Sequence, residues 1–334
     1  MVDPRILLVR LGSLGDIVHT LPAAAALRDT FPSARLDWIV DPRWARLLEG
    51  NPDLSDVVRL DRSGTAGIAA TARKLRKVKY TCAIDFQGLY KSALLAFASG
   101  APQRIGFQFS YAREGLAALL YTNRLNPSGA HKVEHNLTLA AGAGAKIAAP
   151  RFPLTIRAED DDAVERGLGE AKVDDFFVLN PGGGWISKCW PAECYGALHR
   201  LLATRYGWRG VVSVGPGEES LARRVVETSG DPRAISLTLP LGPLMALLRR
   251  AKFVVSADTG PLHIASALGA PVVGLYGPTD PSRNGPYSVE DVVVRNPRAS
   301  ETTYDRGASY SPAMLSITEE QVLDAIERRL RLDT

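Results

Sequence analysis

The sequence predicts an α/β protein of two domains, each built on a parallel sheet, and three observations support this. The 334-residue chain is long enough for two domains of ordinary size. It begins with a short apolar strand, a glycine-containing loop, a helix and a second strand, and the same pattern restarts at residue 176. Residues 253–280 form a further strand–helix–strand unit. Such alternation is typical of sheets with helices on both faces.

Composition and charge exclude several classes of protein. Hydrophobic residues make up 46% of the chain and charged residues 23%, as in soluble globular proteins. No apolar run approaches the roughly 18 residues of a membrane span. Asp3 and Pro4 interrupt the N-terminal stretch, so we expect no signal peptide. Cys82, Cys189 and Cys194 lack metal-ligand spacing, which indicates reduced thiols in the cytoplasm.

The first half contains apolar strands over residues 5–9, 36–40, 57–60 and 82–85. The loop after the first strand leads into a helix that we expect over residues 17–30, with Pro22 inside its opening turns. Asp16 precedes this helix, where the helix dipole stabilises a carboxylate. The functional alternative is a carboxylate that accepts a proton. The loop has only Gly12 and Gly15 of a dinucleotide fingerprint, which argues against NAD.

Residues 148–153 are predicted to form an extended linker, because alanine, proline and arginine replace the periodic pattern there. We therefore place an N-terminal domain over residues 1–150 and a C-terminal domain over residues 151–315. The last segment, residues 316–334, is a helix opened by the capping pair Thr318 and Gln321. We expect this helix to pack back toward the N-terminal domain.

In the second half, three glycines follow the strand over residues 176–180, and Lys188 follows them. Consecutive glycines leave backbone N–H groups accessible to a ligand, and a lysine adds a charge suited to phosphate. The loop lacks the Gly-Lys-Ser/Thr ending of an ATPase P-loop. After the next strand, Glu218 and Glu219 are candidates either for capping a helix or for accepting ribose hydroxyls.

Asp258, Thr259 and Gly260 lie between a short apolar strand and a helix that begins at Pro261. The first N–H groups of a helix lack partners and carry partial positive charge, so this turn is a candidate anion site. The alternative is an ordinary strand–helix turn capped by Thr259. For His263, the alternative to a binding role is simple packing near the helix start.

A basic run occupies residues 73–79 and contains Arg73, Lys74, Arg76 and Lys77. Such runs are usually the solvated face of a helix. This run could also bind phosphates or an anionic membrane surface.

Four segments of the chain resemble, in order, the lipopolysaccharide heptosyltransferases. They are LVRLGSLGDIVHTLPAAAALR, AIDFQGLYKSALLA, LNPGGGWISKCWP and SADTGPLHIASALGAPVVGLYGPTDPSRNGPY. The His19–Pro22 continuation is more similar to type I enzymes than to type II. The resemblance implies an inverting glycosyltransferase of the GT-B fold, with two Rossmann-like domains facing across a cleft. It would transfer heptose from ADP-L-glycero-D-manno-heptose to the Kdo of the lipopolysaccharide inner core.

The resemblance also implies roles for particular residues. Asp16 would be the general base, and Lys188 would stabilise the departing diphosphate. The other residues expected to bind the donor are Gly183, Gly184, Ser187, Glu218, Glu219, Met245, Asp258, Thr259, Gly260 and His263. Those expected to bind the acceptor are Ser13, Gly15, Arg73, Lys74, Arg76, Lys77, Gln87 and Lys91.

The expected partners are a nucleotide-sugar and an anionic lipid A–Kdo acceptor, with no nucleic acid, no metal and no other cofactor. We expect a monomer in the cytoplasm or on the cytoplasmic face of the inner membrane. Two alternatives remain at this stage: a family member with another donor or acceptor, such as a type II enzyme, and a sugar-nucleotide epimerase of the same fold. Residues 288–315 match no known pattern, and the loop from Asn180 to Gly184 departs from type I.

Overall fold

The computed structural model describes residues 3–169, 175–296, 302–303 and 307–332. The chain divides into two compact units, Met1–Thr155 and Ile156–Thr334. The boundary lies a few residues beyond the predicted one because the expected linker is bound to the first unit. Its Arg151 forms ion pairs with Asp53 at 2.8 Å and Asp29 at 2.6 Å. The segment from 288 to 315, which the sequence left unassigned, lies partly outside the described residues.

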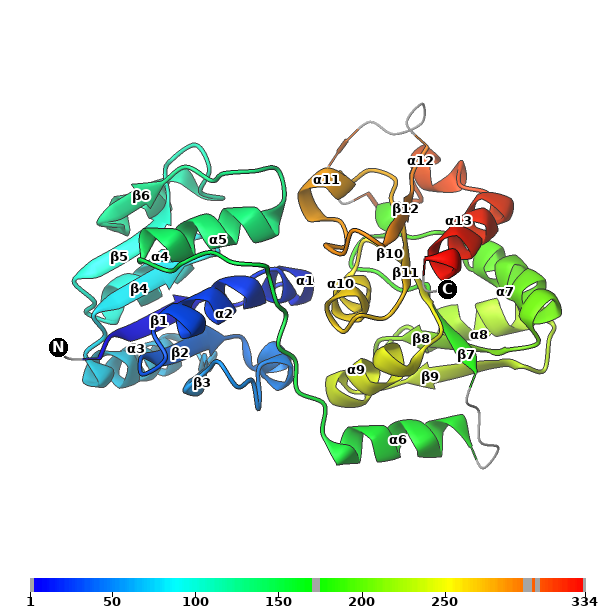
Figure 1. Cartoon of the computed structure of the whole chain (residues 1–334), viewed down its shortest axis with the longest axis horizontal. Coiled ribbons are helices and arrows are strands. Elements are labelled where there is room, and N and C mark those ends of the chain that lie inside the picture. The colour runs from blue at the N-terminus through cyan, green and yellow to red at the C-terminus, as the bar shows by residue number, and fades with distance from the viewer. Residues whose placement is uncertain (1–2, 170–174, 297–301, 304–306, 333–334) are drawn as a thin grey trace. The chain divides into compact units, whose positions relative to one another are not determined.

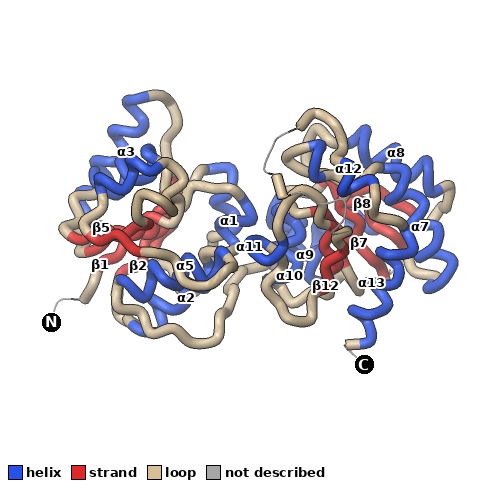
Figure 2. The backbone as a smooth tube through the Cα atoms, turned by 90° about the horizontal axis from the view of Figure 1, so that it is seen from above, coloured by secondary structure: helices blue, strands red, loops and turns tan. Residues whose placement is uncertain are grey.

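The N-terminal unit is built on a six-stranded parallel sheet in the order β3-β2-β1-β4-β5-β6 (Figure 1). The strands are β1 (Arg5–Val9), β2 (Arg35–Val40), β3 (Asp56–Arg59), β4 (Cys82–Asp85), β5 (Gln103–Phe107) and β6 (Asn123–Leu125). The helices are α1 (Leu14–Val18), α2 (Leu21–Thr30), η1 (Pro42–Leu47), α3 (Thr65–Val78), α4 (Tyr90–Ala98), η2 (Gly115–Leu120) and α5 (Lys132–Gly142). Figure 2 shows α2 and α5 on one face of this sheet and α3 on the other.

The single helix predicted over residues 17–30 is wrong: the structure divides this stretch into α1 and α2. Thr20 is the N-cap of α2, and Pro22 follows in its first turn. Proline has no N–H and suits a helix start, so the chain restarts its helix there. This break leaves α1 as a short segment that carries Asp16 just beyond the end of β1.

The C-terminal unit repeats the design with a sheet in the order β12-β11-β10-β7-β8-β9 (Figure 1), again fully parallel. Its strands are β7 (Phe176–Asn180), β8 (Arg209–Val214), β9 (Ala234–Thr238), β10 (Val254–Ala257), β11 (Val272–Leu275) and β12 (Val292–Val294). Its helices are α6 (Ala158–Leu168), η3 (Ile186–Lys188), α7 (Ala192–Tyr206), α8 (Glu219–Ser229), α9 (Leu241–Arg250), α10 (Gly260–Ala267), α11 (Pro281–Asn284), α12 (Pro312–Leu315) and α13 (Glu319–Arg331). The predicted α/β fold class with two Rossmann-like domains is confirmed.

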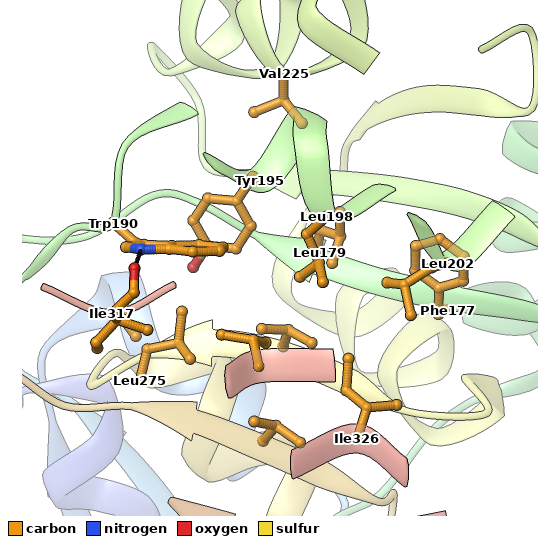
Figure 3. Packing of buried hydrophobic residues seen from close by; sticks show 14 of the residues in the cluster. Phe177, Leu179, Trp190, Tyr195, Leu198, Leu202, Val225, Leu275, Ile317 and Ile326 are labelled. Atoms are coloured by element: carbon orange, nitrogen blue, oxygen red, sulfur yellow. Dashed lines mark hydrogen bonds between the residues drawn. The ribbon is translucent and has the colours of Figure 1, made fainter. Parts of the chain in front are cut away.

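The final helix, α13, packs inside the C-terminal unit. Its Ile326 lies in the same buried cluster as Phe177 of β7 and Leu202 of α7 (Figure 3). The indole N–H of Trp190 donates to the backbone carbonyl of Ile317 at 3.0 Å, which fixes the approach to this helix. Our expectation that the helix packs toward the N-terminal domain is therefore corrected, because its apolar face is buried in the C-terminal core.

Among the helices in the described part of the chain, none has the length and apolar character needed to cross a membrane.

Candidate active-site residues

Asp16 lies in α1, directly beyond the C-terminal end of β1, and is held by two cations. Its Oδ2 atom is 2.6 Å from Nη2 of Arg10, and its Oδ1 atom is 2.8 Å from Nζ of Lys132. The Ser13 hydroxyl donates to Oδ2 at 2.9 Å, and the Ser13 N–H donates to the same atom at 3.3 Å. The Asp16 side chain is 12% exposed, whereas that of Lys132 is 34% exposed. Of the two cations, Lys132 is therefore the more exposed, since the Arg10 side chain is 10% exposed.

The two cations determine the protonation state of Asp16. Burial alone raises the pKa of this carboxyl, but the charges of Arg10 and Lys132 and the Lys132 hydrogen bond lower it by more. The pKa lies well below the ordinary value of 3.8, so Asp16 is a carboxylate at neutral pH. A carboxylate so strongly stabilised is a weak base, and its basicity would rise if one cation were drawn to another anion.

Lys132 is brought to Asp16 from 116 residues away by the packing of α5 on α2. Its neighbour on the same helix, Asn136, donates its side-chain N–H groups to the carbonyl of His19 at 2.9 Å and to the hydroxyl of Thr20 at 3.0 Å. These bonds attach the first turns of α5 to the junction between α1 and α2. The position of Lys132 is therefore fixed by the same junction that positions Asp16.

The structure brings some of the predicted acceptor residues to Asp16. Ser13 contacts it directly, and Gly15 is buried in the same helix. Gln87 lies beside this loop because its side-chain oxygen accepts from the Leu11 N–H at 2.8 Å. Lys91 is exposed in the first turn of α4, which follows β4 at the same end of the sheet.

The basic run, which we expected to bind the anionic acceptor, does not lie beside Asp16. Arg73, Lys74, Arg76 and Lys77 are exposed in the last turns of α3. That helix ends where the strands begin, since Thr81 donates its backbone N–H to the Arg5 carbonyl at 2.8 Å. Asp16 follows the C-terminal end of β1, so it lies at the opposite end of the strands from the last turns of α3.

In the C-terminal unit, Asp258 is the centre of a second charged cluster. Its Oδ2 atom accepts from Nζ of Lys188 at 2.6 Å and from the side-chain amide of Asn284 at 2.9 Å. Its Oδ1 atom is 3.2 Å from Nε2 of His263, five residues further along the chain. Lys188 also lies over the Trp185 ring, 4.4 Å from the ring centroid. The cluster thus joins the loop after β7 with the start of α10 and with α11.

Asp258 is a buried carboxylate that holds the side chains of Lys188 and His263 in place. Burial raises the pKa of Asp258, but the His263 hydrogen bond and the charge of Lys188 lower it by more, so the pKa lies far below 3.8. Its side chain is 5% exposed. A buried carboxylate would repel a diphosphate if it were presented to one. Lys188 has three N–H donors, so it can hold Asp258 and still donate to a phosphate oxygen.

The glycine-rich loop lies against the turn that begins α10. A Cβ atom on Gly183 would be 3.3 Å from the Thr259 methyl group, whereas a Cβ on Gly184 would meet nothing within 4 Å. Asn180, at the end of β7, accepts at its Oδ1 atom from the hydroxyls of Ser256 at 3.1 Å and Thr259 at 3.3 Å. The loop is therefore held beside the N-terminus of α10, with open space at Gly184. Ser187, in η3, is buried.

The structure distinguishes the two glutamates. Glu218 lies against the glycine-rich loop: a Cβ on Gly182 would be 2.3 Å from its Oε2 atom, which accepts from the Gly215 N–H at 2.9 Å. Glu219 accepts from the Gly217 N–H at 3.0 Å and is exposed in the first turn of α8. Met245, which we also expected to contact the donor, is fully buried in α9.

Sequence reasoning missed Lys132 and Asn284 as partners of the two carboxylates. Both pairs span long sequence separations, and the residue types alone give no sign of a contact. Arg10 was not predicted as a partner of Asp16 either, although a cation six residues before Asp16 in the same loop was a usable signal. Among the described residues, no group of three or more His, Cys, Asp or Glu side chains could hold a metal ion.

Comparison with known proteins identifies a consistent set of relatives. Residues 68–313 match the model of glycosyltransferase family 9 (heptosyltransferase). Lipopolysaccharide heptosyltransferase 1 of Escherichia coli K12 is 31% identical over 308 residues, covering 88% of this chain and 94% of the relative. Lipopolysaccharide heptosyltransferase 2 of Salmonella typhimurium LT2 is 26% identical, covering 98% of both chains. The crystal structure of E. coli heptosyltransferase WaaC with ADP superposes with a TM-score of 0.77 at 27% identity, covering 98% of both chains.

Proposed function

Because the chain belongs to glycosyltransferase family 9, the heptosyltransferases, we propose that it transfers heptose from ADP-L-glycero-D-manno-heptose to the Kdo of the lipopolysaccharide inner core. The family membership establishes a glycosyltransferase of lipopolysaccharide biosynthesis. The donor and the acceptor are the proposed part. The greater identity to a type 1 relative, 31% against 26% for a type 2 relative, supports the type I assignment.

The observation that carries the acceptor proposal is the pair of cations around Asp16. Arg10 and Lys132 lie 2.6 and 2.8 Å from the Asp16 oxygens. Kdo is an acidic sugar, and its carboxylate can replace that of Asp16 as the partner of the more exposed cation, Lys132. A neutral sugar offers no such replacement. Binding of an anionic acceptor would then leave Asp16 a stronger base at the moment when it is needed.

The proposed reaction is a single inverting displacement. Asp16 accepts the proton of the attacking acceptor hydroxyl while the hydroxyl oxygen forms a bond to the anomeric carbon of the heptose. The bond from that carbon to the ADP oxygen breaks on the opposite face, and ADP leaves with the electron pair. Lys188 and the backbone N–H groups at the start of α10 stabilise the charge that develops on the diphosphate. Asp258 holds Lys188 and His263 in place for this role.

We further propose that transfer requires no metal, because Lys188 and the α10 N-terminus supply positive charge where the diphosphate would lie. We expect the protein to act as a monomer in the cytoplasm, at the surface of the inner membrane where a lipid-linked acceptor resides. Activity that is unchanged in excess EDTA would support the metal-free proposal. Loss of activity in EDTA that Mg²⁺ or Mn²⁺ restores would contradict it.

The acceptor proposal is tested by mass spectrometry of the products formed from ADP-heptose and two acceptors, Kdo–lipid A and its heptosylated form. We expect Kdo–lipid A to gain the mass of one heptose and the heptosylated acceptor to remain unchanged. Transfer to the heptosylated acceptor alone would replace the type I assignment with type II. If the protein binds ADP-heptose but transfers heptose to neither acceptor, the type I and the type II assignments are both contradicted.

Glu218 is predicted to contribute to donor binding, whereas Glu219 is not. A ribose hydroxyl that donates to the Glu218 carboxylate forms a charge-assisted hydrogen bond, so Glu218→Gln should raise the Kd for ADP about tenfold. Glu219→Gln is the matched control, because Glu219 also accepts from a backbone N–H but is exposed, whereas Glu218 lies against the glycine-rich loop. Calorimetric titration with ADP measures both. Equal affinities for the two variants would contradict the assignment.

A further inference from the structure

One face of the N-terminal unit exposes an unusual number of large apolar side chains. Seven of the fourteen large hydrophobic residues that the described chain exposes lie between residues 90 and 119. Leu94 and Phe97 belong to α4, and Leu116 and Leu119 belong to η2, with exposed fractions of 42%, 52%, 67% and 60%. We call the exposed side of α4 and η2 the apolar face. Monomeric soluble proteins seldom leave such a cluster without a partner.

The two elements of the apolar face form one surface. Ala93 of α4 packs in a buried cluster with Ala117 and Ala118 of η2, so the small residues face inward and the large ones outward. At the start of the pair, the backbone N–H of Tyr90 donates to a side-chain oxygen of Glu114 at 2.6 Å. Within α4 the exposed apolar residues recur at the spacing of one helix face.

The segment that carries the apolar face is strongly basic. Between residues 71 and 125 there are nine lysines and arginines against two acids, a net charge of +7, whereas the whole chain carries +4. One of the two acids, Asp85, is buried. Two of the cations lie directly over aromatic rings: Arg104 is 5.4 Å from the Phe97 ring centroid, and Arg124 is 5.5 Å from that of Phe109.

The basic run on α3 borders the apolar face, which gives that run a role away from Asp16. α3 packs beside α4, and a Cβ on Gly100, just after α4, would lie 3.6 Å from Cγ of Arg76. α4 begins at the same end of the sheet as the Asp16 loop, to which Gln87 is bound through the Leu11 N–H. The apolar face therefore extends from the end of the sheet that holds Asp16 toward the cationic end of α3.

We propose that the apolar face, bordered by these cations, docks on an anionic lipid bilayer. Apolar and aromatic side chains enter the boundary between headgroups and acyl chains, while lysines and arginines bind lipid phosphates. This deepens the proposed function, because it rests on a lipid-linked acceptor and specifies the surface that meets the lipid. A symmetric dimer is disfavoured because it would place two faces of like charge against each other. A nucleic acid is disfavoured as the partner because exposed leucines gain nothing from contact with a charged phosphate backbone.

Co-sedimentation with vesicles tests the proposal without any substrate. The test variant is Leu94→Ser/Leu116→Ser/Leu119→Ser. The control is Leu201→Ser/Leu315→Ser/Leu332→Ser in the C-terminal unit, whose leucines are 40%, 57% and 60% exposed. We expect the wild type and the control to bind vesicles of phosphatidylcholine with phosphatidylglycerol at low salt, and the test variant to bind about tenfold more weakly. Phosphatidylcholine alone, or high salt, should abolish most binding.

Several results would overturn the proposal. They are equal vesicle binding by the test and control variants, no dependence on anionic lipid, or no binding by the wild type. A wild-type dimer in sedimentation velocity that the test variant abolishes, without vesicle binding, would assign the face to a second copy of the chain. Unchanged thermal unfolding verifies that each variant is folded. Heptose transfer to a water-soluble Kdo acceptor needs no bilayer, so the test variant should catalyse it at the wild-type rate. If the wild type itself fails to transfer heptose to this acceptor, the proposed function is contradicted, whereas the docking proposal is still decided by vesicle binding.

Discussion

Replacing Asp16 with asparagine is expected to lower kcat by about 10²- to 10⁴-fold, the usual contribution of a positioned general base. Asparagine keeps the shape of the side chain and can still accept a hydrogen bond from Lys132, but it cannot take the acceptor proton. Donor affinity should not change, because the residues proposed to bind ADP-heptose belong to the other unit. Steady-state transfer measured with saturating donor and acceptor tests the first expectation, and titration with ADP tests the second.

The control for this variant is Asp41→Asn, which removes a carboxylate at the end of β2 that is paired with Arg43 and Arg62. It should transfer heptose at nearly the wild-type rate. In the wild type, the depressed pKa of Asp16 keeps the carboxylate ionised as the pH falls, so kcat/KM measured against pH should show no loss at the pH where an ordinary aspartate becomes protonated. Full transfer by Asp16→Asn would contradict the assigned base and leave the family membership unchanged.

Replacing Lys188 with methionine is expected to lower kcat/KM by about 10²- to 10³-fold, because the charge on the departing diphosphate loses its nearest side-chain cation. The ammonium lies 2.6 Å from Asp258 and 15% of the side chain is exposed, so it is positioned and still reachable. The Kd for ADP should rise as well. Transfer kinetics and calorimetric titration measure the two effects.

Lys252→Met is the matched control for Lys188→Met. Lys252 also pairs with an aspartate, Asp175, at 2.6 Å, and it lies 6.0 Å from the centroid of the Trp208 ring, but it is exposed. It should behave as the wild type. Because methionine at 188 leaves the buried Asp258 with one fewer partner, the double variant Lys188→Met/Asp258→Asn provides a second measurement. Near-wild-type turnover in the double variant would contradict the role of Lys188.

Local patterns predicted most of the fold. The apolar runs of β1, β2, β4, β7 and β10 were identified because buried parallel strands are short and continuous in hydrophobicity. The break between α1 and α2 was missed because Pro22 fits the opening turns of a helix that begins at residue 17 as well as those of one that begins at residue 21. The packing of α13 could not be predicted, because an amphipathic helix shows which of its faces is buried without showing what covers that face.

The site was predictable only where local chemistry determined it. Asp16 and the turn at Asp258 follow strands and precede helices, a position that sequence patterns reveal. The pairing of Asp16 with Lys132 spans 116 residues, so it depends on how α5 packs. The burial of Met245 was not predicted, because its position in α9 did not reveal that its side chain faces the core. The basic run has the charge that we noted, but topology places it at the other end of the sheet.

Acceptor-dependent release of ADP is the most direct test of the proposed transfer. The measurement is the initial rate of ADP release from ADP-heptose by the wild-type protein in EDTA, with and without Kdo–lipid A. We predict rapid release with the acceptor and little without it, because the Asp16 carboxylate acts on an acceptor hydroxyl. Conversion of the nucleotide-sugar without acceptor, as an epimerase would produce, would contradict the account. Equal rates with and without Kdo–lipid A would contradict it as well.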